Sequence, residues 1–178
     1  KKMTKLVGDL LTVARTDGKA NQLKISHMDI VSAARQTVRI MRPFAEKKDI
    51  VIEEVLPKKL EIYADEQKIR QLILILVDNA VKYTQEHGKI KVSLMAEKGE
   101  IHLTVADNGI GIEPEHRERI FDRFYRVDKA RSRRMGGNGL GLAIARGIVE
   151  AHHGEISLES AVNEGTTFHV RLKEKTKS

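Results

Sequence analysis

The chain has 178 residues, of which 40% are hydrophobic and 32% are charged, as expected for one globular domain with an aliphatic core. It has no Cys, which excludes disulfides and thiolate metal sites, and no apolar run of the roughly 20 residues that a membrane helix needs. The net charge of +7 is compatible with nucleic-acid binding, but its distribution along the chain favours a nucleotide.

The N-terminal part of the chain predicts two helices. Residues 3–15 place apolar side chains at helical spacing, and residues 21–26 are expected to form a short connection. A second helix is expected at about 29–48, with Asp29 as its N-cap. Pro43 should bend this helix or end its regular hydrogen bonding, because proline has no backbone N–H.

The middle of the chain predicts two short strands and the strongest helix. The strands are expected at 50–55 and 60–63. Asp65 then caps a helix from about 66 to 83, whose apolar side chains recur every three or four residues.

The second half of the chain predicts two hairpins and one helix. The hairpin strands are expected at 89–96, 100–106, 155–160 and 166–172. A helical turn is expected at 115–120 and a helix at 140–152. Because helices and strands do not alternate regularly, we expect a two-layer α/β sandwich, in which helices cover one face of a mixed, mostly antiparallel sheet.

A glycine cluster at 136–142 opens the last predicted helix. Glycines at this place let a phosphate approach the backbone, and the unpaired N–H groups of the first helical turn point towards it. The segment 126–134, directly before the cluster, contains five basic residues and one acidic residue. It is either a loop that contacts phosphate, with Arg126 as the best candidate, or an ordinary solvated loop.

The helix at 66–83 carries three polar candidates, Asn79, Lys82 and Tyr83, near its C-terminal end. An amide oxygen suits Mg²⁺, a lysine three residues later can reach a phosphate, and a tyrosine ring can lie against a base. Taken alone, these residues would rather be a capping amide, a surface lysine and a core tyrosine; the other motifs favour function.

A further candidate is Asp107, which ends a predicted strand and is followed by Gly109 and Gly111. A carboxylate at the floor of a site can accept a hydrogen bond from the exocyclic amine of adenine and would select ATP over GTP. The alternative is a turn in which Asp107 bonds its own backbone. The hydroxyl of Thr166 could assist Asp107 through a water molecule, although strand propensity alone also explains this threonine.

The aromatic residues of FDRFYR (121–126) favour packing of the loop over ligand contact for Phe121 and Phe124. The histidines show no metal-ligand spacing. His152 and His153 are adjacent and therefore point apart, so we interpret them as structural or solvated.

Five motifs in order resemble the catalytic, ATP-binding domain of bacterial sensor histidine kinases. These are DNAVKYT (78–84), DNGIGI (107–112), FDRFYR (121–126), GGNGLGL (136–142) and GTTF (165–168). The resemblance implies the Bergerat-type ATP-binding fold, with ATP and Mg²⁺ as ligands, and it covers nearly the whole chain.

The resemblance also implies roles for individual residues. Asn79 coordinates Mg²⁺, and Lys82 and Arg126 approach the phosphates; these three are the expected catalytic residues. Asp107 bonds the adenine amine. The remaining residues implied in ATP binding are Tyr83, Gly109, Gly111, Ile112, Gly137, Gly139, Leu140, Gly141, Leu142 and Thr166.

Two positions depart from the family pattern. Position 138 is Asn where Thr or Ser is usual, and position 75 is Ile where the family often has a second Asn and related ATPases have a water-activating Glu. Ile75 therefore argues against an ATP-hydrolysing relative.

Residues 1–18 resemble the end of a dimerisation-domain helix, so we expect a catalytic ATP-binding domain at 19–178. Because the first residue is Lys1 rather than Met, we expect a segment of a longer protein. None of the seven histidines stands in the family's phospho-acceptor context, so the acceptor histidine is expected on the dimerisation domain, with a response-regulator aspartate next in the relay.

The expected location is cytoplasmic, without direct contact to the membrane, and the parent protein is expected to be a homodimer. No nucleic-acid partner is expected. The alternatives are a kinase with a serine acceptor, and a non-catalytic module that senses nucleotide or binds nucleic acid through its basic surface.

Overall fold

The computed structural model describes residues 22–125 and 141–174. The helix predicted at 3–15 and the basic segment 126–134 lie outside these ranges. A five-stranded sheet has the strand order β2-β4-β5-β7-β6, and β2 is parallel to β4 whereas the other pairs are antiparallel. Its strands are β2 (Val51–Val55), β4 (Lys89–Glu97), β5 (Glu100–Asp107), β6 (Glu155–Ala161) and β7 (Gly165–Lys173).

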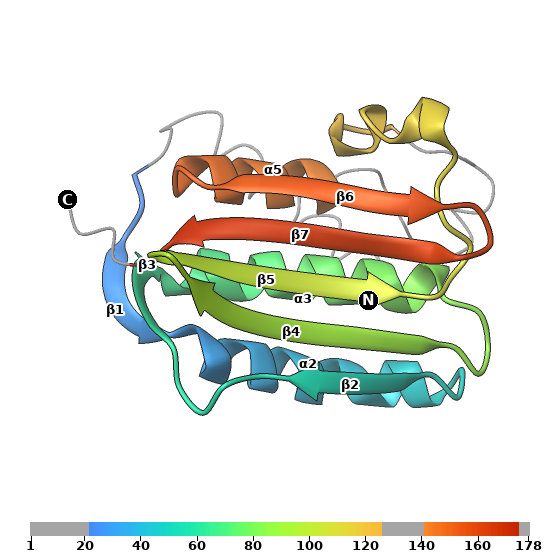
Figure 1. Cartoon of the computed structure of the whole chain (residues 1–178), viewed down its shortest axis with the longest axis horizontal. Coiled ribbons are helices and arrows are strands. Elements are labelled where there is room, and N and C mark those ends of the chain that lie inside the picture. Colours follow the sequence, from blue (N-terminus) through green and yellow to red (C-terminus); the bar gives the residue numbers. More distant parts are fainter. Residues whose placement is uncertain (1–21, 126–140, 175–178) are drawn as a thin grey trace.

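In the described part of the chain, the helices α2 (Ile30–Glu46), α3 (Glu66–Tyr83) and α5 (Gly141–Ala151) all lie on one face of this sheet (Figure 1). The predicted two-layer α/β sandwich with a mixed, mostly antiparallel sheet is therefore confirmed. The expected helical turn at 115–120 consists of two short 3-10 helices, Pro114–His116 and Arg119–Phe121.

The expected connection at 21–26 is wrong in part, because Ile25–Asp29 forms a strand, β1. It pairs antiparallel with β3 (Glu61–Asp65) in a second, two-stranded sheet. The two strands are more than thirty residues apart in the sequence, so the pairing partner cannot be found from the local pattern. The last residue of β1, Asp29, is also the N-cap of α2 and accepts a hydrogen bond from Val31 N at 3.0 Å.

Pro43 interrupts α2 less than expected, because the helix continues to Glu46. Because Pro43 has no backbone N–H, the carbonyl of Arg39, four residues earlier, lacks its usual helical hydrogen bond. Arg39 and Pro43 both lie on the exposed side of the helix, where water can bond that carbonyl.

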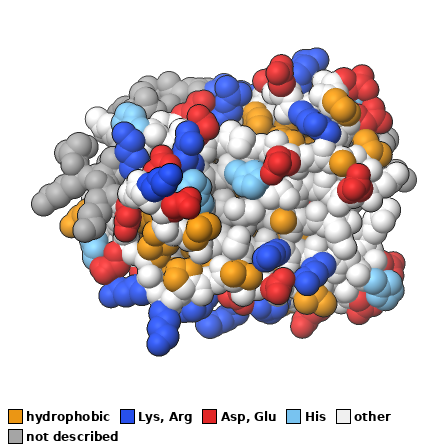
Figure 2. Space-filling view, in the orientation of Figure 1, with side chains coloured by type: hydrophobic (Ala, Val, Ile, Leu, Met, Phe, Trp, Pro, Cys, Tyr) orange, Lys and Arg blue, Asp and Glu red, His pale blue; other side chains and the backbone are white. Residues whose placement is uncertain are grey.

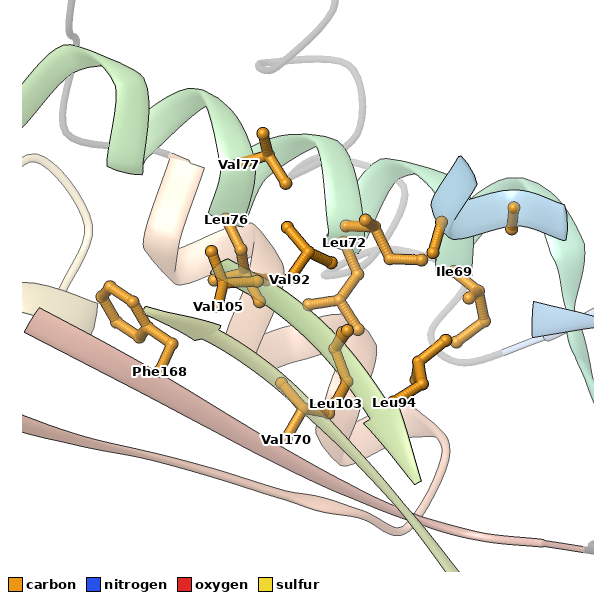
Figure 3. Close-up of a cluster of buried hydrophobic side chains, with 14 of the residues drawn as sticks. Ile69, Leu72, Leu76, Val77, Val92, Leu94, Leu103, Val105, Phe168 and Val170 are labelled. Atoms are coloured by element: carbon orange, nitrogen blue, oxygen red, sulfur yellow. The ribbon is translucent and has the colours of Figure 1, made fainter. Parts of the chain in front are cut away.

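The core lies between the sheet and the helices. Ile69, Leu72 and Leu76 of α3 face inward-pointing side chains of β4, β5 and β7 (Figure 3). Phe168, at 2% exposure, is the largest of these strand side chains. Helix α3 has the predicted bounds, and Asp65 caps it through a hydrogen bond from Lys68 N at 3.2 Å.

The opposite face of the sheet has no covering helix in the described part of the chain. Figure 2 shows this face with charged side chains of both signs interspersed. Arg171, for example, pairs with Glu155 at 3.0 Å and with Glu100 at 3.5 Å. No described helix is both long enough and apolar enough to pass through a lipid bilayer.

Helix α5 ends in a left-handed turn at His153, whose φ is 60°. The N–H of Gly154 bonds the carbonyl of Val149 at 2.9 Å, which is the bond that closes a Schellman-type helix end. Glycine is favoured at the left-handed position because it has no Cβ, whereas His153 must accept the steric cost.

We expect His153→Gly to raise the free energy of unfolding by about 0.5–1 kcal/mol, because the strain of a side chain at positive φ is removed. Urea denaturation measures this change. His153→Ala is the matched control, since it removes the exposed imidazole but retains the Cβ. A glycine variant no more stable than the alanine variant would contradict the assignment of strain.

Candidate functional site

A row of polar side chains ends the apolar inner face of the sheet. In the strand register, Asp107 lies opposite Thr166, and Thr166 lies opposite Ser160. Opposed residues share a face, and these three lie two positions beyond the core-facing residues Val105, Phe168 and Leu158 of the same strands. The core-facing surface therefore changes from aliphatic to polar at one end of β5, β7 and β6.

The carboxylate of Asp107 is held by two backbone donors. Oδ1 accepts from Gly109 N at 2.8 Å and from Thr166 N at 3.2 Å. Within the described part of the chain, Oδ2 accepts no hydrogen bond. Burial raises the pKa of Asp107 above its usual value, and the two N–H donors oppose that rise. The side chain thus offers one fixed and partly desolvated oxygen to a ligand.

The local turn at Asp107 is present, whereas recognition of a base by its carboxylate stays a prediction. The bond from Gly109 N is the local turn that we considered as the alternative, and the bond from Thr166 N comes from a different strand. The second donor, Thr166 N, shows that the Asp107 carboxylate also bonds outside its own turn. The turn therefore orients the carboxylate and leaves its second oxygen unbonded by the described residues.

The loop after β5 connects this row to α3. Ile110 N donates to the carbonyl of Tyr83 at 3.1 Å, and a Cβ at Gly109 would overlap that same carbonyl. Gly111 has a φ of 74°, and a Cβ there would overlap the carbonyl of Ala161. Both glycines are required by close backbone approach, Gly109 to the end of α3 and Gly111 to the end of β6.

Helix α3 carries the predicted residues Asn79, Lys82 and Tyr83 in its last turns, and all three are half-buried. Lys82 Nζ pairs with Asp78 at 3.0 Å, one turn earlier on the helix. The amide of Asn79 makes no hydrogen bond to the rest of the described chain. A half-buried amide oxygen without a partner is a suitable ligand for a hard cation that keeps waters and phosphate oxygens as its other ligands.

The start of α5 is the other predicted element of the site. A Cβ at Gly141 would lie 3.5 Å from Ile75 Cγ2, so α5 begins beside α3, one turn before Asn79. Leu142 is partly buried against the core. The predicted residues Arg126, Gly137, Gly139 and Leu140 lie outside the described residues, and so does Asn138.

The FDRFYR segment has one packed phenylalanine and one exposed one. Phe121 packs edge-on against Phe168 with ring centroids 6.1 Å apart, as a packing role requires. Phe124 is 59% exposed with a φ of 64°, so the expectation that it packs the loop is wrong.

His152 anchors the far end of α5. Its Nε2 accepts from Asp65 N at 3.0 Å, and its Nδ1 donates to the carbonyl of Ile148 at 2.8 Å. It is 7% exposed and therefore structural, whereas its neighbour His153 is exposed. Asp65 also binds Lys24 N through Oδ2 at 3.0 Å. The imidazole of His152 thus connects α5 to the start of α3, and the carboxylate of Asp65 connects that point to the chain before β1.

Sequence reasoning missed two side chains that position the site. Ser160 Oγ contacts Ile112 N, the carbonyl of Gly165 and the Thr166 hydroxyl. Arg117 donates to the backbone carbonyls of Ser160 and Ile112. Extending the alternation of β6 to its polar end would have identified Ser160. No local signal identifies Arg117.

One cluster of possible metal ligands occurs in the described residues, although the sequence showed no such spacing. Ligand atoms of Glu113, Glu115 and His116 lie within 4.8 Å of one another. The two carboxylates are exposed, and His116 Nδ1 is bonded to the Tyr125 hydroxyl. Such acidic clusters are common on surfaces without an ion, and we assign this one no function.

Comparison with known proteins settles the family. The profile described as histidine kinase-, DNA gyrase B-, and HSP90-like ATPase matches residues 64–176. The chain belongs to this family. The histidine-protein kinase ArlS of Staphylococcus haemolyticus is 37% identical over 173 residues, which are 97% of this chain and 38% of that protein. Sensor histidine kinase YkoH of Bacillus subtilis is 37% identical over 97% of this chain and 37% of its own length.

Solved structures agree with this assignment. Full-length ShkA in complex with AMPPNP has a TM-score of 0.86 and 32% identity, and the match covers 99% of this chain and 36% of ShkA. The mycobacterial sensor histidine kinase MprB has a TM-score of 0.74 and 26% identity over 86% of this chain and 99% of its own. The resemblance drawn from the five motifs is confirmed, and the family supports ATP as the ligand. The chain spans less than two fifths of the ArlS and YkoH sequences.

We expect the contribution of His152 to stability to be lost on acidification. Burial lowers the pKa of His152 below 6.5, so below pH 6.5 the unfolded chain binds a proton that the folded chain excludes. Its stabilisation is therefore present above pH 6.5 and lost as the pH falls below it. The excess stability of the wild type over His152→Asn should shrink between about pH 7.5 and about 5.5.

Urea denaturation at the two pH values measures this difference. His153→Asn, which changes the adjacent exposed imidazole, is the matched control and should show no such trend. A constant difference between the wild type and His152→Asn would contradict the buried neutral state of His152.

Proposed function

We propose that this domain binds Mg-ATP and donates the γ-phosphoryl group to a histidine side chain, as the catalytic domain of a sensor histidine kinase. The observation that supports this most directly is the Asp107 carboxylate, which two backbone N–H groups hold beside the end of α3. The same helix presents Asn79 and Lys82. The proposed acceptor for the base, Asp107, therefore lies beside the helix that carries the proposed phosphate-site residues, Asn79 and Lys82.

Base recognition rests on Asp107 in this proposal. Its Oδ2 accepts no bond from the described residues, so the exocyclic amine of adenine can donate to it. Guanine has a carbonyl at the corresponding position, and two acceptors that face each other repel. Tyr83 borders the base, while the backbone of Gly109, Gly111 and Ile112 forms the neighbouring wall. ATP is therefore favoured over GTP.

The phosphates are assigned to α3 and α5. The Asn79 amide oxygen fits a Mg²⁺ ligand, because it is half-buried and has no partner in the described chain. Mg²⁺ would neutralise charge on the phosphate oxygens. Lys82 adds positive charge, and Arg126 does so from the segment before the glycine cluster. Backbone N–H groups of Gly137, Gly139, Leu140, Gly141 and Leu142 form the triphosphate cradle, and Thr166 belongs to the base site.

The acceptor is a histidine on a dimerisation domain, and the next acceptor is an aspartate of a response regulator. Two observations support transfer over hydrolysis. Position 75 is Ile75, which packs against the core and cannot activate water. The names of the relatives include histidine-protein kinase. Catalysis then consists mainly of positioning and charge neutralisation by Asn79 with its metal and by Lys82.

We expect Asp107→Asn to lower the affinity for ATP by about tenfold or more. Both backbone donors bind Oδ1, so an Asn side chain would keep its oxygen there and turn its NH2 group towards the adenine amine. Calorimetric titration with ATP and with GTP measures the effect. Asp49→Asn, which changes an exposed carboxylate, is the control. Unchanged ATP affinity in the Asp107 variant would remove this residue from base recognition.

We expect phosphoryl transfer when this chain is mixed with a separate dimerisation domain that carries the acceptor histidine. With Mg²⁺ and γ-labelled ATP, that domain should acquire an acid-labile label. Asn79→Ala should reduce labelling by about tenfold or more, because the metal loses its side-chain ligand. Gln85→Ala, an exposed amide just after α3, should not. Label that appears only on a serine substrate would favour a serine kinase, and ATP binding without any transfer would favour a sensing role.

A further inference from the structure

Ser160 completes the polar row beside Asp107. It lies at the end of the edge strand β6, opposite Thr166, and Thr166 in turn lies opposite Asp107. Thr166 is 6% exposed, and its backbone N–H already donates to the Asp107 carboxylate. The hydroxyl of Thr166 is therefore confined close to the base-recognition carboxylate, and its hydrogen-bond direction matters for any base placed there.

The hydrogen-bond partners of Ser160 determine where its proton lies. Its Oγ accepts from Ile112 N at 2.7 Å, donates to the carbonyl of Gly165 at 3.0 Å, and lies 2.8 Å from Thr166 Oγ1. A serine hydroxyl has one proton and two lone pairs. All three bonds form together only if the proton of Ser160 goes to Gly165 and the proton of Thr166 goes to Ser160.

This assignment makes the Thr166 hydroxyl an acceptor towards its remaining neighbours. Its only proton is used by Ser160, and two lone pairs remain. A group that bonds Thr166 Oγ1 directly must then donate. The 6-amino group of adenine can donate, whereas the 6-keto group of hypoxanthine or guanine cannot.

We propose that Ser160 is a specificity-determining positioning residue that selects 6-amino purines by fixing the direction of the Thr166 hydroxyl. This inference rests on the proposed binding of ATP beside Asp107. Ser160 acts through Thr166 and not by touching the base. In Ser160→Ala the Thr166 proton is released, and the hydroxyl can rotate to donate to a keto oxygen. Discrimination between the two purine types then falls.

Arg117 provides a matched control, because it ties the same segments without taking part in the hydroxyl chain. Its guanidinium donates to the backbone carbonyls of Ser160 and Ile112. Arg117→Ala therefore loosens the contact between β6 and the loop after β5 and leaves the hydroxyl of Ser160 in place. A purely structural role of this contact would affect Arg117→Ala and Ser160→Ala alike.

The test is calorimetric titration of this chain with ATP and with inosine triphosphate, which carries a 6-keto group in place of the 6-amino group. Ser160→Ala should reduce the ratio of the two affinities by about fivefold or more. Arg117→Ala should keep the ratio within about twofold. Thr166→Val should reduce the ratio of the two affinities to the same extent. The double variant Ser160→Ala/Thr166→Val should then have the same ratio as Thr166→Val alone. Ser160→Thr retains the hydroxyl and should retain the ratio.

An unchanged ratio in Ser160→Ala or Thr166→Val would overturn the inference, and so would an equal shift in Arg117→Ala. If Ser160→Ala does not fold, the Thr166→Val ratio still tests the inference, because an unchanged ratio there shows that the Thr166 hydroxyl does not discriminate. A wild-type chain that binds no ATP would overturn the proposed function itself. ATP binding with an unchanged ratio in the variants would overturn this inference alone.

Discussion

The position of the Asp107 carboxylate constrains the rest of the site. A charge at the end of an apolar sheet face is unfavourable, and the raised pKa of Asp107 reports that cost. Hydrogen bonds from Gly109 N and Thr166 N offset part of it. The carboxylate is stable there only if a tight turn follows β5 and if β7 begins in register beside it. One charged side chain is thus compatible with this site only in the observed turn geometry and strand register.

The glycines of the site follow from the same constraint. The turn after Asp107 must pass against the carbonyl of Tyr83 and then against Ala161, and neither approach leaves room for a Cβ at Gly109 or Gly111. Gly165 faces the backbone of Asp107 in the same way, with a φ of 115°. Close backbone packing around one carboxylate thus brings α3, β5 and β7 together at one corner of the fold.

Local pattern was sufficient for most helices and strands, whereas the roles of the candidate residues stay predictions. Helix α3 was predicted with its cap at Asp65, because its apolar period and its N-cap are both local signals. Strand β1 was missed because its partner, β3, is far away in the sequence. Ser160 and Arg117 were missed because their role depends on strand register and on contacts across the chain. Phe124 was misjudged because its left-handed backbone is not encoded in residue type.

Helix α5 is fixed from the end opposite the proposed phosphate cradle. Its C-terminal end is held by the buried imidazole of His152, bonded to Asp65 N, and by the left-handed turn at His153. At its start, Gly141 comes close to Ile75 of α3, an apolar contact that uses no backbone donor. The first N–H groups of a helix have no partner within the helix. Anchoring at the far end therefore positions α5 without consuming the donors that an anionic ligand would bind.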